Sequence, residues 1–269
     1  MIPAFFAGKI GLIGDDYRLA VAFFSFCAIA GSVYILNDIV DVEKDRLHEL
    51  KRSRPLATGA VSFKTAVFLM LILTAIAVAT ALLVGLTFFY VIIGYFVLNI
   101  AYSLYLKRVS LIDISLIAVG FDLRVLAGGI AAQVPVSKWL ILMTFLLACC
   151  LALGKRRDDL LLDVDKHELR QSLKGYTVPF IDTCLIVFAG TTIVCYIMYT
   201  VSEEVVHRLG SDHIYLTSVF VIIGILRFLQ IAIVEQKSGS PTLILLKDRM
   251  IQAMIGLWFV AFLVILYAS

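Results

Sequence analysis

Residues 37–59 read N-D-I-V-D-V-E-K-D-R-L-H-E-L-K-R-S-R-P-L-A-T-G, and they lie between two long apolar segments. The first half of this stretch carries an amide and a series of carboxylates, and the second half is rich in lysine and arginine. Acidic side chains are costly within a membrane, so carboxylates that continue directly out of a membrane-length helix indicate a functional role. The stretch therefore predicts a site for a charged ligand at the end of such a helix.

The composition is that of an integral membrane protein. The 269 residues are 61% hydrophobic and 16% charged, whereas soluble domains are about 45–50% apolar and about 25% charged. Apolar blocks of about 18 residues or more predict transmembrane helices. An apolar piece at 3–13 is too short to cross a bilayer. The expected spans are residues 17–39, 61–84, 86–106, 111–132, 139–153, 178–200, 214–234 and 251–267.

The predicted fold is an all-α bundle of about eight to nine transmembrane helices. No linker rich in Pro, Gly or Ser interrupts the chain, so residues 1–269 are expected to form one transmembrane domain. Alternating the spans places the loops near 40–60, 107–110, 154–177 and 235–250 on one side. With Lys64, just past the first loop, this side gathers seventeen Lys and Arg residues, against four on the other side. The positive-inside rule then predicts that these charged loops face the cytoplasm.

The acidic half of the opening stretch has the spacing of a metal site. If the helix continues past Asn37, then Asn37, Asp41 and Asp45 follow one another at i, i+4 and i+8 on one face, with Asp38 beside them. Asn37 and Asp45 are about 12 Å apart along the axis, so the row suits a pair of hard cations such as Mg²⁺, shared with a ligand. The alternative is a solvated helix whose acids pair with neighbouring bases, and the spacing alone leaves both open.

The basic half favours a phosphate ligand. Lys51, Arg52 and Arg54 follow closely, and Pro55 biases Arg54 toward an extended conformation that ends the helix. Arginine binds phosphate with two parallel hydrogen bonds, and lysine acts as a point charge. The positive-inside rule already demands basic loops, but it does not demand acids in the same loop.

Two further charged clusters repeat this mixture of acids and bases. In the loop that begins near residue 154, Asp159 and Asp163 form a D-x-x-x-D pair beside the basic run Lys155, Arg156 and Arg157. The third cluster, near residues 102–113, offers Tyr102, Ser103, Lys107 and Asp113. Three such clusters in a membrane bundle are typical of a site for a polyanionic substrate and a metal.

Arg124 lies in the middle of an expected span, where a charge costs about 2.5–3.5 kcal/mol by insertion scales. It follows Asp113 by eleven residues, which is close to three helical turns, so both residues lie on one face. Its expected partner is either a phosphate on a lipid-embedded substrate or a carboxylate such as Asp122 in a structural ion pair. Asp122 and Arg124 are two residues apart and do not face each other. Arg227 is a second intramembrane arginine of this kind.

The sequence also excludes several kinds of site. The five cysteines all lie in apolar blocks without a C-x-x-C pair, so they are expected to pack in the bundle. The four histidines lie in loops, and no Ser/His/Asp or Cys/His set or glycine-rich phosphate loop is present. The net charge of +3 is too small to suggest nucleic acid as a partner.

Several segments resemble one known family. N-D-I-V-D-V-E-K-D at 37–45 resembles the N-D-x-x-D-x-x-x-D motif of the UbiA superfamily of intramembrane prenyltransferases. Further segments are similar to its decaprenyl-phosphate phosphoribosyltransferase branch, above all D-I-S-L-I-A-V-G-F-D-L-R-V-L-A-G-G at 113–129 and L-G-K-R-R-D-D-L at 153–160. The others are K-R-S-R-P-L-A-T-G at 51–59, N-I-A-Y-S-L-Y-L-K at 99–107, S-E-E-V-V-H-R-L-G-S-D at 202–212 and S-G-S-P-T-L-I-L-L-K-D-R at 238–249.

The resemblance implies nine transmembrane helices around a central cavity open to the cytoplasmic side of the cell (inner) membrane. It also implies Mg²⁺-dependent transfer of phosphoribose from phosphoribosyl pyrophosphate (PRPP) to a polyprenyl phosphate; oligomerisation stays open. By motif, the metal and the leaving diphosphate would be held by Asn37, Asp38, Asp41 and Asp45. The implied PRPP contacts are Lys51, Arg54, Lys155 and Arg156, and the implied pocket between donor and lipid phosphate is lined by Tyr102, Lys107, Asp113 and Arg124.

The chain departs from the family pattern at three points. Members of the family begin with a first helix that carries an R-P-x-Q-W-x-K-N-like segment, and this chain is expected to begin within that helix, truncated. Asp159 stands where the branch has Glu, which keeps the charge and shortens the reach. Asp122 replaces an apolar residue.

Two other functions remain open at this stage. One is a UbiA-type prenyl transfer, in which an isoprenoid moves from its diphosphate to an aromatic or polar acceptor. The other is a transporter or scaffold whose loops bind anionic lipid and catalyse nothing.

Overall fold

The computed structural model describes residues 17–47, 51–161 and 171–268, and the short apolar piece at 3–13 lies outside these ranges. Within the described ranges every regular element is helical. The longer helices are α2 (Tyr17–Leu47), α3 (Phe63–Val84), α4 (Leu86–Leu104), α5 (Ile112–Ala131), α6 (Lys138–Leu161), α7 (Val178–Val201), α9 (Ser218–Leu229) and α11 (Arg249–Ala268). The short ones are η2 (Leu106–Arg108), η3 (Gln171–Gly175), α8 (Glu203–Leu209), η4 (His213–Thr217), η5 (Gln230–Val234) and α10 (Pro241–Lys247).

By length and composition, 8 candidate membrane spans are found in the described part of the chain. They match the eight spans expected from the sequence, so the prediction of an all-α, multi-pass membrane protein is confirmed. Two helices run well past their predicted ends. α2 continues to Leu47 and α6 to Leu161, and these extensions place Asp41, Asp45, Asp158 and Asp159 on helices.

The chain divides into two compact units, which are described separately. Unit 1 comprises the residues up to Lys107 together with Leu123–Pro135, and unit 2 comprises Arg108–Asp122 and Val136–Ser269. α5 contributes its first part to unit 2 and its second part to unit 1. The prediction of one domain over 1–269 stays a prediction.

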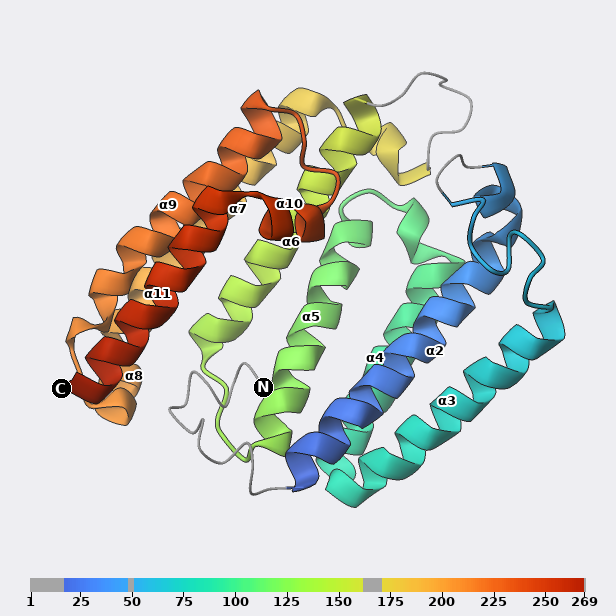
Figure 1. The fold of residues 1–269 in the computed structure, drawn as a ribbon, viewed down its shortest axis with the longest axis horizontal. Coiled ribbons are helices and arrows are strands. Elements are labelled where there is room, and N and C mark those ends of the chain that lie inside the picture. The colour runs from blue at the N-terminus through green and yellow to red at the C-terminus, as the bar shows by residue number, and fades with distance from the viewer. Residues whose placement is uncertain (1–16, 48–50, 162–170, 269) are drawn as a thin grey trace. The chain divides into compact units, whose positions relative to one another are not determined.

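In unit 1, α2 packs against both α3 and α4, and the three helices run side by side (Figure 1). Small polar residues of α2 line its contact with α3. The Ser25 hydroxyl donates to the carbonyl of Ala77 at 2.9 Å, and the Ser32 and Thr74 hydroxyls lie 2.7 Å apart. Small residues allow close approach of membrane helices, and their hydroxyls find partners across the interface. This packing fixes the direction in which α2 presents its acidic end.

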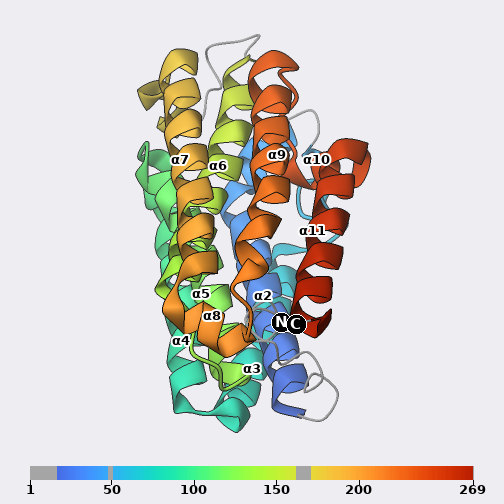
Figure 2. The ribbon, with the colours of Figure 1, turned by 90° about the vertical axis from the view of Figure 1, so that its left-hand side faces the viewer.

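In unit 2, α6 packs along α7, and α9 packs against both α7 and α11 (Figure 2). Leu153, Ile181 and Leu185 are fully buried where α6 meets α7. Arg157 of α6 is buried as well, and its Nε atom donates to Asp182 Oδ1 of α7 at 2.6 Å. Arg157 is therefore a structural residue that joins two helices.

The segment before α10 is anchored by Asp158, a buried carboxylate near the end of α6. Asp158 Oδ1 accepts from the backbone N–H of Ser238 at 3.0 Å and from its hydroxyl at 2.8 Å, and Oδ2 accepts from the N–H of Gly239. A Cβ atom at Gly239 would lie 2.8 Å from Asp158 Oδ2, so this approach requires glycine. Asp158 therefore supports the fold, although its neighbour Asp159 belongs to the candidate site.

Replacing Asp158 by alanine should destabilise the protein by about 2–4 kcal/mol, because the buried N–H of Ser238 and the part-buried N–H of Gly239 lose their acceptor. Thermal unfolding in detergent measures this change as a lower midpoint. Asp212→Ala is the control, since the Asp212 side chain is 77% exposed. Equal midpoints for the two variants would show that Asp158 does not anchor the segment.

Arg227 has a structural role. Its guanidinium donates to Asp248 Oδ2 from Nη2 at 2.7 Å and lies 2.7 Å from Glu235. The hydrogen bond from Arg227 lowers the pKa of Asp248, because it stabilises the ionised carboxylate. Asp248 Oδ1 in turn accepts from the N–H of Ile251 in the first turn of α11. Arg227 therefore joins the end of α9 to the start of α11.

Candidate active site

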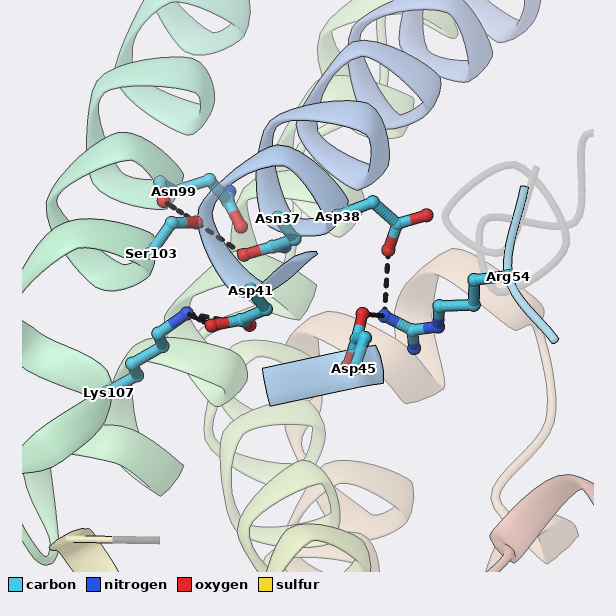
Figure 3. Close-up of polar contacts among 8 residues, drawn as sticks. All are labelled: Asn37, Asp38, Asp41, Asp45, Arg54, Asn99, Ser103 and Lys107. Carbon is cyan, nitrogen blue, oxygen red and sulfur yellow. Dashed lines mark hydrogen bonds and ion pairs between the residues drawn. The ribbon is translucent and has the colours of Figure 1, made fainter. Parts of the chain in front are cut away.

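The acidic end of α2 brings two carboxylates onto one arginine. Arg54 Nη1 lies 2.7 Å from Asp38 Oδ1 and 2.8 Å from Asp45 Oδ2 (Figure 3). The two carboxylate oxygens are therefore at most about 5.5 Å apart, the sum of these distances. Asp45 is buried, and Asp38 and Arg54 are partly exposed. Two acids that lie about two turns apart on one helix thus converge on a partly open position.

The structure corrects the predicted row of Asn37, Asp41 and Asp45. Each step of four residues advances about 40° beyond a full turn, so Asp45 is displaced by about 80° from Asn37. Asp38 and Asp45, seven residues apart, differ by only about 20° and share Arg54. The four side chains therefore form two pairs, Asp38 with Asp45 and Asn37 with Asp41.

The second pair faces α4. Asn37 Oδ1 lies 2.5 Å from the Ser103 hydroxyl, which also lies 2.7 Å from the carbonyl oxygen of Asn99 (Figure 3). Lys107 Nζ donates to both carboxylate oxygens of Asp41, at 2.6 and 2.8 Å. Lys107 is only 7% exposed. Within unit 1, the structure thus brings Ser103 and Lys107 of the third charged cluster to the first cluster.

The remaining bases of the first stretch lie on the surface. Lys51 and Arg52 are exposed in the turn that leads to α3, while Arg54 reaches back to α2. Arg46 pairs with Glu43 at 3.0 Å, and both side chains are half-exposed or more. The alternative interpretation, in which the acids of this stretch pair with neighbouring bases on a solvated helix, therefore holds for Glu43 and Arg46, which lie outside the candidate site.

In unit 2, Arg156 is the centre of the second charged cluster. Its Nε atom donates to Asp113 Oδ2 at 2.8 Å, and Nη1 donates to Asp159 Oδ2 at 3.2 Å. Asp113 is fully buried and Arg156 nearly so, whereas Lys155 is exposed and Asp159 is partly exposed. The structure therefore joins three predicted site residues, Asp113, Arg156 and Asp159. The predicted partner Asp163 lies outside the described residues.

Arg124 is not brought to the carboxylates of α2. Its guanidinium donates to the Tyr95 hydroxyl at 2.8 Å and lies over the rings of Phe26 and Tyr95, 5.8 and 5.5 Å from their centroids. Phe26 precedes Asp38 by twelve residues of α2, or about 18 Å along the axis. Arg124 instead forms part of an otherwise apolar pocket of unit 1, of about 280 Å³.

Tyr102, another of the predicted site residues, is partly buried in α4.

The donor set of the first cluster fits a hard divalent cation. In the described part of the chain, no three His, Cys, Asp or Glu side chains are grouped closely enough to hold an ion by themselves. Magnesium does not require such a group, because it takes one or two carboxylates and completes its shell with phosphate oxygens and water. Asp38 and Asp45, supported by Asn37 and Asp41, supply that kind of partial, all-oxygen site.

Two tyrosines belong to these clusters and were not expected from the sequence. Tyr176 bonds to Asp113, and Tyr95 bonds to Arg124. Tyr176 follows Asp113 by sixty-three residues, a separation that no local pattern links. A buried charge mid-span predicts that some polar partner exists, but it does not identify Tyr95.

Comparison with known proteins assigns the chain to a family. The model of the UbiA prenyltransferase family matches residues 2–240. A decaprenyl-phosphate phosphoribosyltransferase of Mycolicibacterium smegmatis is 32% identical over 90% of this chain and 78% of its own length. The one of Corynebacterium glutamicum is 30% identical over 89% of this chain and 73% of its own length.

A solved structure has the same fold. A UbiA homologue from Archaeoglobus fulgidus, bound to GPP and Mg²⁺, superposes with a TM-score of 0.71 over 93% of this chain and 87% of that one, at 19% identity. The resemblance seen in the sequence motifs is therefore confirmed across almost the whole chain. The chain is a membrane transferase that belongs to the UbiA prenyltransferase family.

Proposed function

We propose that this protein transfers 5-phosphoribose from PRPP to a polyprenyl phosphate of the decaprenyl type, releasing diphosphate. The observation that carries the proposal is the 32% identity, over 90% of the chain, to a decaprenyl-phosphate phosphoribosyltransferase. The family model alone supports the coarser alternative, transfer of an isoprenoid from its diphosphate. The two decaprenyl-phosphate phosphoribosyltransferases, at 32% and 30% identity, favour phosphoribosyl transfer.

The carboxylates of α2 are assigned to metal and diphosphate. Asn37, Asp38, Asp41 and Asp45 would hold Mg²⁺, and the archaeal homologue bound to Mg²⁺ and a prenyl diphosphate supports a divalent cation in this fold. When bound, the ion neutralises the charge that develops on the departing diphosphate. Arg54 and Lys107 each lie within 2.8 Å of these carboxylates and are placed to bind phosphate oxygens there.

The bond changes need no strong general base. An acceptor phosphate oxygen, already anionic at neutral pH, forms the new bond to ribose C1, and the bond from C1 to the diphosphate oxygen breaks with its electron pair. The transition state resembles an oxocarbenium ion, as in other glycosyl transfers. Positioning and charge neutralisation by the protein then supply most of the rate acceleration. The absence of a suitable His or Cys among the sequence motifs agrees with this chemistry.

In unit 2, Lys155, Arg156 and Asp159 are assigned to the donor, and Asp113 is assigned to the support of Arg156. In unit 1, Lys51 is assigned to the donor phosphates, and Tyr102 is assigned to the lining of the pocket. The bias of Lys and Arg toward loops on one side of the spans supports a site on the cytoplasmic face of the cell membrane.

A transfer assay in membranes tests the proposal. Membranes that contain the protein, labelled PRPP, Mg²⁺ and decaprenyl phosphate should form a lipid-linked label, and removal of Mg²⁺ should lower its rate by about 10²-fold or more. Omission of the polyprenyl phosphate is the control and should abolish the product. Activity confined to a prenyl diphosphate and an aromatic acid would replace the proposal with prenyl transfer.

A further inference from the structure

A tyrosine outside the family motifs is buried beside the charged cluster of unit 2. Tyr176 follows η3 and is only 4% exposed. Its hydroxyl donates to Asp113 Oδ1 at 2.8 Å and accepts from the backbone N–H of Leu111 at 2.6 Å. Burial raises the pKa of Tyr176, so its hydroxyl keeps the donated proton at neutral pH. The tyrosine is thus bonded both to a fully buried carboxylate and to the backbone before α5.

The surrounding backbone is shaped for this contact. Leu111 has a φ of 67°, a left-handed conformation that is uncommon for a residue other than glycine. A Cβ atom at Gly175 would lie 2.0 Å from the Ser110 hydroxyl oxygen, so only glycine allows the segment before Tyr176 to approach so closely. A left-handed residue on one side of the contact and a close approach that requires glycine on the other therefore accompany the Tyr176 hydrogen bonds.

Asp113 passes this constraint on to Arg156. Its Oδ1 atom accepts from Tyr176 and its Oδ2 atom accepts from Arg156 Nε, so each oxygen has a defined donor. A carboxylate held at one oxygen cannot rotate freely to follow the guanidinium at the other. Of the three neighbouring bases, Arg157 is held by Asp182 and Lys155 is exposed, so Arg156 is the one that Tyr176 reaches through Asp113.

We propose that Tyr176 is a positioning residue: through Asp113, it fixes the orientation in which the Arg156 guanidinium binds a phosphate oxygen of the donor. The inference rests on the proposed function, which supplies the donor. Tyr176 does not touch the substrate, and its effect is expected in donor affinity, because a guanidinium that is free to reorient binds a phosphate less well.

The test compares two Tyr→Phe variants in membranes, with PRPP varied at saturating Mg²⁺ and decaprenyl phosphate. Tyr176→Phe should raise the KM for PRPP about tenfold and lower kcat less than about threefold, the scale of one hydrogen bond to a charged group. KM does not depend on the amount of folded enzyme, so a loss of protein lowers only the maximal rate.

Tyr196→Phe is the matched control. Tyr196 is a buried tyrosine of α7, and its hydroxyl lies 2.7 Å from the Thr217 hydroxyl and accepts from Trp258 Nε1 at 2.6 Å. The Tyr196→Phe variant loses as many hydrogen bonds as the Tyr176→Phe variant, and neither of the two that it loses involves Asp113. Its KM should stay within about twofold of the wild type, whereas thermal stability should fall in both variants. An equal rise of KM in both variants would assign Tyr176 a structural role and overturn the proposal.

A double-mutant cycle with Arg156→Lys identifies the route. If Tyr176 acts through Arg156, the double variant should have the KM of Arg156→Lys alone; independent effects that multiply would overturn the proposal. If the Tyr176→Phe protein does not accumulate, Asp113→Asn takes its place, because it replaces one of the two acceptor oxygens that link Tyr176 to Arg156, and the same KM rise is expected. A wild-type protein without lipid-linked product would instead reject the proposed function itself.

Discussion

Replacing Asp38 and Asp45 together by asparagine should lower phosphoribosyl transfer by about 10³-fold or more, because the ligand set for metal and diphosphate loses both converging charges. Both oxygens lie within 2.8 Å of Arg54 Nη1, so the two substitutions act on one position. The initial rate of transfer from labelled PRPP measures the loss. Since Arg54 is partly exposed and can be solvated, the folded state should lose only about 1 kcal/mol or less.

Glu43→Gln is the control for these substitutions. Glu43 lies on the same helix between Asp38 and Asp45, but its side chain is 80% exposed and pairs with Arg46. Its activity should stay within about twofold of the wild type. A double asparagine variant that keeps most of its activity would favour the alternative of a transporter or scaffold whose loops only bind anionic lipid.

Lys107→Met should lower kcat/KM by about 10²-fold, because the site loses a buried cation beside the diphosphate. Lys107 is 7% exposed and holds both oxygens of Asp41 at 2.6 and 2.8 Å. Breaking this pair should also destabilise the protein by about 1–3 kcal/mol, a range that allows for the partial exposure of Asp41. Steady-state kinetics and thermal unfolding measure the two effects separately.

Adding Asp41→Asn to Lys107→Met separates the two roles of the lysine. The second substitution removes the carboxylate left without its partner, so thermal stability should recover while activity stays low. Lys64→Met is the control, because Lys64 is an exposed residue in the first turn of α3. Recovery of activity in the double variant would contradict both the assignment of Asp41 to the metal and the assignment of Lys107 to the diphosphate.

Much of the fold follows from hydropathy. All eight spans could be predicted, because each is an apolar block that stands out from the charged segments of the chain. The predicted spans end at residues 39 and 153, since hydropathy falls where the charges begin, whereas α2 and α6 continue to Leu47 and Leu161. For α2, this continuation past Asn37 is the condition on which the predicted metal-site spacing rests. The helix does not end with the apolar block, because charged residues can continue it outside the hydrocarbon.

The site was predicted in composition but not in detail. The motif acids could be named, yet the pairing of Asp38 with Asp45 depends on accumulated helical drift and on the return of Arg54 from the following turn. Asp158 and Tyr176 escaped notice because their partners are distant in the chain, Ser238 for the first and Asp113 for the second. The charge of Arg124 predicted a polar partner, and the structure gives it the Tyr95 hydroxyl together with the rings of Phe26 and Tyr95. Its place in the pocket between donor and lipid phosphate, which the resemblance implies, stays a prediction.

The central claim is that the acids at the end of α2 bind a pyrophosphorylated sugar through a divalent cation. Titration of PRPP into the purified protein, with Mg²⁺ and with a chelator, tests this claim most directly. The account predicts that Mg²⁺ tightens PRPP binding about tenfold or more and that the double substitution of Asp38 and Asp45 by asparagine removes this gain. Equal affinity with and without Mg²⁺, or a gain that survives in the double variant, would contradict it.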